Sequence, residues 1–280
     1  MEKHALKELE QRISEKFLNA LEQDDYPKAS SLCKGVGKEF HTMHTILTNT
    51  IKSLMDELTP LISSRERHYV EDIEAEIAKQ NKEKAREILK DKTAYYSDLH
   101  DIYVEFMGRL ISYLYEYHRG EGLYNVLKTI GEQQKERFLG AMSLPIETIV
   151  KNSAMIMRSH PRGRLTIDED SEKFTFSCGP CGSGGYLLDG GFYDPPKGFA
   201  LIRDPQSMTW NNRDFPSYCV HCALWNEILP IEWKGYPYWV HKPPDKKNDP
   251  CVFYIYKDPK KIPKEHYDLF LKEGKKASPK

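Results

Sequence analysis

Four cysteines in two short pairs carry the clearest chemical signal in this chain. Cys178 and Cys181 form one C-x-x-C turn, Cys219 and Cys222 form a second, and 37 residues separate the two pairs. Each turn lets two thiolates converge on one ion, and two such turns are typical of a tetrahedral Cys₄ zinc site. We therefore predict that these four cysteines bind zinc and that the ion stabilises a C-terminal domain.

Other uses of the same cysteines stay open. Iron bound as in rubredoxin is the alternative metal, because paired C-x-x-C turns also hold iron. His221 lies inside the second pair and is able to replace one cysteine, which would leave a position open for water or substrate. A thioredoxin-like dithiol is disfavoured, because the run Gly182-Ser-Gly-Gly after Cys181 is a poor helix start.

The glycine-rich loop after Cys181 is a second candidate feature. Consecutive glycines leave backbone N–H groups free to bind an anion, and Ser183 adds a hydroxyl beside them. The simpler interpretation is a turn that lets the chain leave the metal site. We keep Ser183 as a candidate catalytic residue.

An internal repeat predicts the organisation of the N-terminal half. Apolar residues recur at helical spacing there, and the pattern returns after 56 residues. The matching pairs include Lys28 with Lys84, Ala29 with Ala85, His44 with His100, Ile46 with Ile102, and Leu54 with Leu110. We expect two helical hairpins, 4–62 and 65–118, in which the first long helix ends before Pro60.

His44 and His100 occupy equivalent positions in the two copies. A pseudo-two-fold arrangement would bring both to the bundle centre, so both are candidate catalytic or ligand-binding residues. The alternative is a pair of buried histidines that hydrogen-bond across helices. A di-iron centre is not supported, because no Glu-x-x-His pair is present.

Composition changes after residue 160, where tryptophan, glycine and proline become frequent. Alternating apolar residues predict strands at 165–168, 173–177, 186–188, 237–241 and 251–256. The predicted fold class is α+β, with an all-α bundle followed by a zinc domain with antiparallel strands. The predicted boundaries are 1–140 for the bundle, 141–160 for a connecting helix, 161–272 for the metal domain and 273–280 for a tail.

Several further residues in the second half have two interpretations. The many aromatic side chains either fill a small core or line a ligand pocket. Glu227 and Glu232 are candidate general bases. Cys33 and Cys251 are interpreted as apolar core residues rather than ligands.

The charge balance restricts the class of protein. The net charge is -1, so we expect no nucleic-acid partner. No apolar run approaches the roughly 20 residues that span a bilayer, and the N-terminus is charged, so we expect a cytoplasmic protein without a membrane partner.

Together these features favour a zinc enzyme of the hydrolase or lyase type. Its small-molecule substrate would lie at the interface of the helical and metal domains. Hydride transfer is disfavoured because no nucleotide-binding motif is present. The alternatives are a zinc-stabilised protein-interaction module without enzyme activity, and a rubredoxin-like electron carrier.

Overall fold

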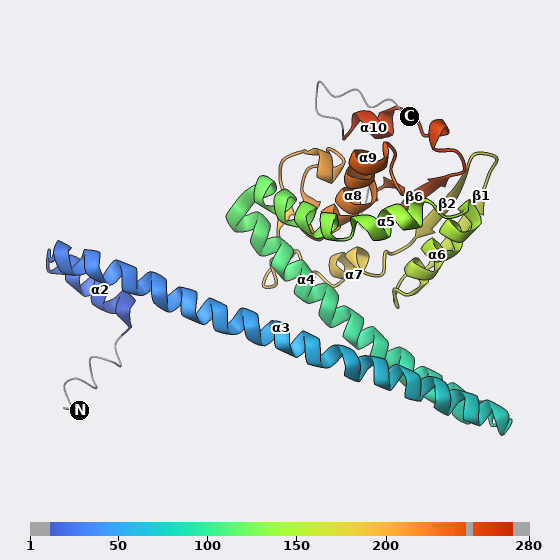
Figure 1. The fold of residues 1–280 in the computed structure, drawn as a ribbon, viewed down its shortest axis with the longest axis horizontal. Coiled ribbons are helices and arrows are strands. Elements are labelled where there is room, and N and C mark those ends of the chain that lie inside the picture. Colours follow the sequence, from blue (N-terminus) through green and yellow to red (C-terminus); the bar gives the residue numbers. More distant parts are fainter. Residues whose placement is uncertain (1–11, 245–248, 271–280) are drawn as a thin grey trace. The chain divides into compact units, whose positions relative to one another are not determined.

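The computed structural model describes residues 12–244 and 249–270 and divides the chain into two compact units, which meet between Leu89 and Lys90 (Figure 1). Each unit is considered by itself. The described chain is mostly helical with a small antiparallel sheet, which confirms the α+β class. In the described residues, no helix is both long and apolar enough to cross a membrane.

The first unit contains α2 (Ile13–Glu22), α3 (Tyr26–Ala78) and the beginning of α4 (Lys82–Gln133). α2 packs on the start of α3 through small side chains, with Ala20 and Ala29 buried. Gly35 allows the close approach, because a Cβ there would lie 3.1 Å from the side chain of Ile13. Asp25 caps α3 by accepting a hydrogen bond from the Lys28 amide at 3.1 Å.

The two turns that join these helices have the same geometry. Asp24 in the first turn has φ 56° and Gln80 in the second has φ 57°. The residue after each one caps the next helix, and Asn81 Oδ1 accepts from the Lys84 amide at 3.3 Å as Asp25 does from Lys28. The two turns are 56 residues apart, which is the offset of the sequence repeat.

The expected end of the first long helix before Pro60 is wrong, because α3 continues through Pro60 to Ala78. Proline in a helix interior costs about 3 kcal/mol, since it removes one hydrogen bond and clashes with the preceding turn. The surrounding turns contain many leucine, methionine, lysine and glutamate residues, whose helical preference offsets this cost.

In the second unit α4 changes direction at Arg119, which has φ 58°, as expected from the glycines that follow it. Two more helices come next, α5 (Lys135–Met142) and α6 (Ile146–Arg158). One face of α4 contributes Val104, Ile111, Leu123 and Leu127 to the larger hydrophobic core.

The main sheet has the strand order β1-β2-β6-β5 and is antiparallel throughout. Its strands are β1 (Leu165–Glu169), β2 (Lys173–Cys178), β5 (Val240–Lys242) and β6 (Cys251–Tyr256). Phe176 and Phe253 are paired across β2 and β6, and their rings stack with centroids 4.6 Å apart. With Trp239 and Ala154 of α6 they form the smaller core.

The remaining elements surround the larger core. A helical run from Ser217 to Lys234 comprises η2 (Ser217–Cys219), α8 (Val220–Ala223), η3 (Leu224–Ile228) and α9 (Leu229–Lys234). α9 contacts α5, and the two appear together in Figure 1. The other elements are β3 (Leu201–Ile202), η1 (Ser207–Thr209), β4 (Phe215–Pro216), η4 (Pro259–Lys261) and α10 (Glu265–Asp268).

One strand expectation is wrong. Residues 186–188 lie in α7 (Gly184–Asp189), which begins inside the glycine-rich loop that we judged a poor helix start. Burial outweighs local preference here, because the helix places Leu187, which is fully buried, in the larger core.

Candidate functional site

A cavity of about 460 Å³ in the second unit collects most of the residues that the sequence singles out. Cys181, Ser183, Cys219 and Cys222 all line it. Its wall also includes the aromatic residues Tyr193, Trp210, Phe215 and Tyr218. Phe215 and Tyr218 also belong to the larger core, so the core and the cavity wall share aromatic side chains.

The sheet and the helical run bring the cysteines together. Cys178 ends β2 directly opposite Cys251 at the start of β6. Cys178 is buried in the smaller core, whereas Cys251 lines the cavity. On the other wall Gly184 permits a close approach of the second pair, since a Cβ at this position would lie 2.7 Å from Cys219 Sγ. Cys251 is therefore a fifth thiol at the site, not only an apolar core residue.

A buried chain of hydrogen bonds lies at this wall. His241 Nδ1 donates to Glu227 Oε1 at 2.9 Å, and the His241 amide donates to the same oxygen at 3.1 Å. Trp210 Nε1 donates to it as well, at 3.0 Å. The His241 side chain also hydrogen-bonds with Cys222. Cys222 Sγ also lies 3.5 Å from His221 Nε2, so two imidazoles surround one sulfur.

These contacts determine the pKa values of Cys222, His241 and Glu227. Burial by itself raises the pKa of Cys222, but the charges and hydrogen bonds of His221 and His241 outweigh it and lower that pKa to about 5. Burial lowers the pKa of His241, but Cys222 and Glu227 outweigh it and raise it to about 9. At neutral pH the pair is therefore a thiolate and an imidazolium. Burial raises the pKa of Glu227, although its hydrogen bonds act in the opposite direction.

The neighbouring thiols differ from Cys222. Burial, followed by the charges of the other cysteines, raises the pKa of Cys178 to about 12. The same causes raise the pKa values of Cys219 and Cys251 well above the ordinary thiol value. Among these four thiols, Cys222 is the one whose surroundings favour the thiolate.

Tyr193 is a further polar residue at the cavity. The hydroxyl of Tyr193 is buried and makes no hydrogen bond of normal geometry with any of the described residues. Burying an unsatisfied hydroxyl costs free energy. A bound molecule with a polar atom at this wall would recover that cost.

The predicted zinc ligands do not form a ready metal-binding group. Among residues 12–244 and 249–270, no set of three or more His, Cys, Asp or Glu side chains has an arrangement that could hold a metal ion. The Cys₄ zinc site stays a prediction. The iron alternative stays one too.

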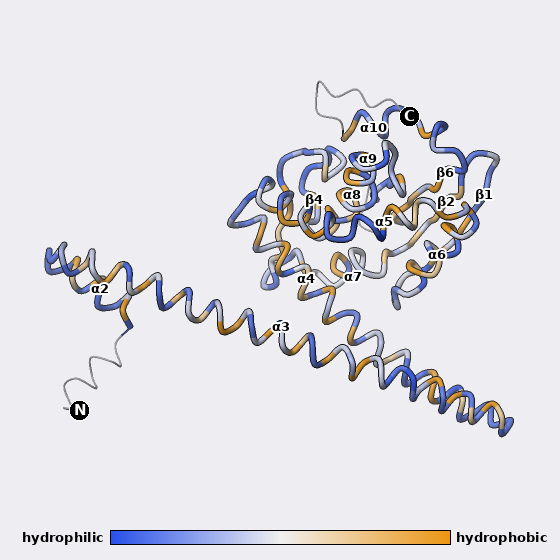
Figure 2. Tube along the Cα trace, in the orientation of Figure 1, coloured by the Kyte–Doolittle hydropathy of each residue, from blue (hydrophilic) through white to orange (hydrophobic). Residues whose placement is uncertain are grey.

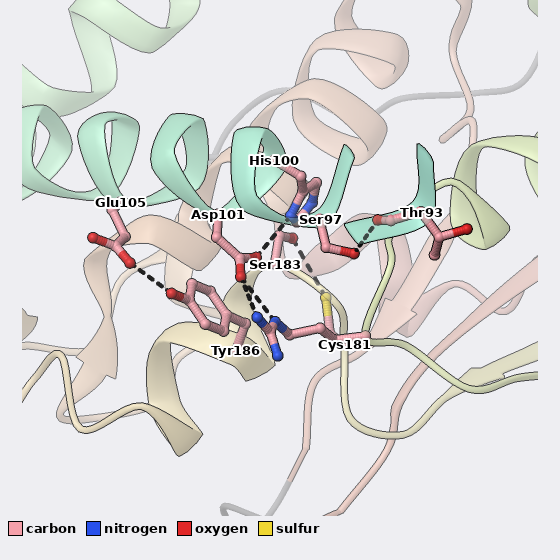
Figure 3. A network of polar contacts seen from close by, with 9 residues as sticks. Thr93, Ser97, His100, Asp101, Glu105, Cys181, Ser183 and Tyr186 are labelled. Carbon is pink, nitrogen blue, oxygen red and sulfur yellow. Dashed lines mark hydrogen bonds and ion pairs between the residues drawn. The ribbon is translucent and has the colours of Figure 1, made fainter. Parts of the chain in front are cut away.

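The two histidines of the repeat have different surroundings. His44 is exposed on α3 in the first unit. His100 of α4 is mostly buried, and its Nδ1 lies 3.2 Å from Asp101 Oδ1 (Figure 3). The other carboxylate oxygen of Asp101 accepts a hydrogen bond from Arg162 Nε at 2.9 Å. Figure 3 also shows Glu105 of the same helix bonded to Tyr186 of α7.

The sequence missed two histidines at or near the site. The His160 ring lies tilted beside that of His100, with centroids 5.3 Å apart. Burial lowers the pKa of His160 to about 4, and the charges of His100 and His221 act in the same direction. His241 was seen only as part of a strand. Its position next to Glu227 follows from the contact of β5 with η3, and no short motif encodes that contact. Glu227 itself was among the candidate bases.

Comparisons with known proteins add no further information. No protein-family model, no curated protein and no solved structure matches this chain significantly.

Proposed function

We propose that this protein is an enzyme that uses Cys222 as a nucleophile on a small organic molecule, in hydrolytic or acyl-transfer chemistry. The observation that carries the proposal is the hydrogen-bonded chain Glu227–His241–Cys222 at the wall of a cavity. A thiol, an imidazole and a carboxylate in this order are the parts of a cysteine-based catalytic triad. The cavity of about 460 Å³ has the size of a small-molecule site.

Each member of the chain has a defined task. The Cys222 thiolate attacks an electrophilic carbonyl carbon and forms a thioester, while the His241 imidazolium gives its proton to the leaving group. The neutral imidazole then takes a proton from water, whose oxygen attacks the thioester and releases the free thiolate. Glu227 accepts a hydrogen bond from His241 Nδ1–H and thereby keeps Nε2 directed at the sulfur.

The experiment uses p-nitrophenyl acetate as the acyl donor. We expect a burst of p-nitrophenol and an acetyl adduct on Cys222, identified by peptide mass spectrometry. Cys222→Ser should abolish the burst, and His241→Gln should reduce it by about 10²-fold or more. Cys33, which is exposed on α3, is the internal reference thiol. Acetylation of Cys222 no faster than that of Cys33 would overturn the proposal.

A zinc enzyme at the same cavity is the second candidate. It is favoured by one observation, that cysteines from both pairs face one cavity and the charges of Cys181 and Cys222 act on Cys219. The pair His241–Glu227 would then orient a ligand, as second-shell carboxylates do. Elemental mass spectrometry decides between the two. One zinc per chain that is lost in Cys181→Ser and in Cys222→Ser would show that Cys222 is a metal ligand rather than a free nucleophile. Iron in place of zinc would support the electron carrier.

We also propose that the helical N-terminal part arose by an internal duplication. The repeated turn geometry at Asp24 and Gln80 and the repeated caps at Asp25 and Asn81 support it. Under this proposal the second short helix of the sequence repeat is the C-terminal part of α3.

A further inference from the structure

The middle of α3 is exposed along its whole length. Every residue from Gly37 to Glu57 is exposed, although this stretch contains many large apolar side chains. Phe40 is 69% exposed and Leu54 is 64% exposed. Figure 2 shows hydrophobic and hydrophilic residues alternating along α3. A helix in water is stabilised mainly by the packing of its apolar face. The apolar side chains of this stretch have no such packing, and exposed apolar surface of this extent indicates a binding surface.

The apolar residues form one continuous stripe. They follow each other in steps of four and three: Val36, Phe40, Met43, Leu47, Ile51, Leu54, Leu58 and Ile62. The pattern repeats every 11 residues, as from Val36 to Leu47 to Leu58. Such a repeat keeps apolar side chains on one face of a nearly straight helix, which is the pattern of a helix that pairs with another helix.

The stripe is complementary to itself when it is reversed. Most stripe residues have an apolar residue equally far from residue 49 on the other side, as in Leu47 with Ile51 and Phe40 with Leu58, whereas Leu54 corresponds to His44. Leu61, which is 67% exposed, corresponds to Gly37. A Cβ at Gly37 would meet no atom within 4 Å, so this position leaves room for a large side chain from a second helix.

The charges of α3 favour the same antiparallel arrangement. Residues 26–48 contain three lysines and one glutamate, whereas residues 50–72 contain five carboxylates and three basic residues. The two halves therefore have opposite net charge. A parallel pair would set like halves side by side, and an antiparallel pair sets opposite halves side by side.

We propose that α3 pairs with α3 of a second copy of this chain, antiparallel and centred on residue 49. The interface is the stripe from Val36 to Ile62, with the basic half of each helix along the acidic half of the other. The protein is then a homodimer whose contact lies wholly in the first unit. This inference does not depend on the chemistry proposed for Cys222.

A single substitution tests the pairing and its register. Cys33 and Arg65 are equally far from residue 49, lie on the stripe face and are both exposed. In Arg65→Cys, mild oxidation should link Cys33 of each copy to the new thiol of the other and give a covalent dimer on a non-reducing gel. Within one chain the two positions are 32 residues apart on one helix, about 48 Å, so no intramolecular link is possible.

Two controls make the result specific. Arg67→Cys places the new thiol on the opposite face of α3 and should give no link to Cys33. Adding Cys33→Ser to Arg65→Cys should abolish the covalent dimer. Linking from Arg67→Cys as efficient as from Arg65→Cys would mean random collision and would overturn the proposed register.

A measurement of mass in solution completes the test. Light scattering should give twice the chain mass of 32.6 kDa for the wild type and the chain mass for Leu47→Glu/Ile51→Glu. Asn49→Glu, on the opposite face, should remain dimeric, and circular dichroism should show equal helix content in all three. A monomeric wild type would overturn the proposal, because the stripe would then be covered by another segment of the chain or by a different partner.

Discussion

Glu227 and His241 form a buried hydrogen bond of 2.9 Å, with the side chains 1% and 4% exposed, respectively. The carboxylate oxygen receives three donors, from the ring and amide of His241 and from the indole of Trp210. A carboxylate this deep is costly unless it is fully hydrogen-bonded. The arrangement fixes the orientation of the His241 ring and leaves its other nitrogen for Cys222. Apolar residues of the same size would not orient the ring in this way.

Replacing Glu227 by Gln should change the reactivity of Cys222 without removing a hydrogen-bond acceptor. The amide keeps an oxygen for the three donors but loses the charge that raises the pKa of His241. With less imidazolium beside it, the Cys222 thiolate is stabilised less. We expect the midpoint of iodoacetamide alkylation of Cys222 to move from near pH 5 towards its ordinary value of 9.0.

The matched control for this prediction is Glu232→Gln. Glu232 was the other candidate base, and it lies half-exposed in an ion pair with Lys128 at 2.6 Å. Its replacement should leave the alkylation midpoint of Cys222 unchanged. Peptide mass spectrometry over a pH series measures both variants, and equal midpoints for Glu227→Gln and the wild type would exclude the role given to Glu227.

The Cys222–His241 pair should also make stability depend on pH. The pKa of Cys222 is lowered from 9.0 to about 5, so its contribution is lost as the pH falls through 5. The pKa of His241 is raised from 6.5 to about 9, so its contribution is lost as the pH rises through 9. Between pH 5 and 6.5 the Cys222–His241 pair binds one proton fewer in the folded chain than in the unfolded chain, so its contribution to stability rises with pH. His160, whose pKa is lowered to about 4, adds a contribution of the same sign over this range. Between 6.5 and 9 the two effects cancel.

The expected gain from the pair between pH 5 and 6.5 is about 2 kcal/mol in the free energy of unfolding. Urea denaturation at several pH values measures it. In Cys222→Ser the increase should be smaller, because the thiolate is absent. If the variant follows the wild-type curve over this range, Cys222 is not ionised in the folded protein.

The sequence predicted the parts of the fold that follow from local periodicity. β1, β2 and β6 lie where alternation placed them, and the long helices follow the apolar repeat. The errors arose where long-range packing decides. Residues 184–189 form a helix despite two glycines, because the helix buries Leu187. Likewise, α3 continues through Pro60. Neither result is visible in a short window of sequence.

The candidate site shows the same division. Cys181, Ser183, Cys219 and Cys222 line one cavity, whereas Cys178 lies in the smaller core. Cys251 joins it because β6 pairs with β2, which brings residues more than 60 positions apart in sequence into register. His241 lies on β5, which pairs with β6 in the same sheet. A pairing of this kind depends on the whole sheet, so a single sequence without relatives does not reveal it.

Removing the carboxylate of Asp101 should destabilise the second unit. Asp101 is 7% exposed and receives hydrogen bonds from Arg162, with His100 at its other oxygen. The Arg162 side chain is half-exposed, so water compensates part of its loss. We expect Asp101→Ala to cost about 1–3 kcal/mol. Arg203→Ala breaks an exposed pair with Asp214 and should cost less than about 0.5 kcal/mol. Equal urea midpoints for the two variants would contradict the structural role of Asp101.

Two glycines in helices should respond in opposite ways to the same substitution. A Cβ at Gly108 of α4 would lie 2.5 Å from the ring of Phe199 and 3.2 Å from Leu187, and both of these side chains are buried in the larger core. Overpacking of this kind typically costs about 1–3 kcal/mol, which exceeds the roughly 1 kcal/mol that alanine gains over glycine in a helix. Gly108→Ala should therefore lower the free energy of unfolding.

Gly140 of α5 provides the comparison, because a Cβ there would meet no atom within 4 Å. Gly140→Ala keeps only the helical gain and should stabilise the protein by up to about 1 kcal/mol. Urea denaturation of both variants at one pH measures the contrast. Adding Phe199→Leu to Gly108→Ala should recover part of the loss, since the shorter side chain clears the space that the new methyl group needs. A stabilising effect of Gly108→Ala alone would mean that α4 does not pack against Phe199 as closely as described.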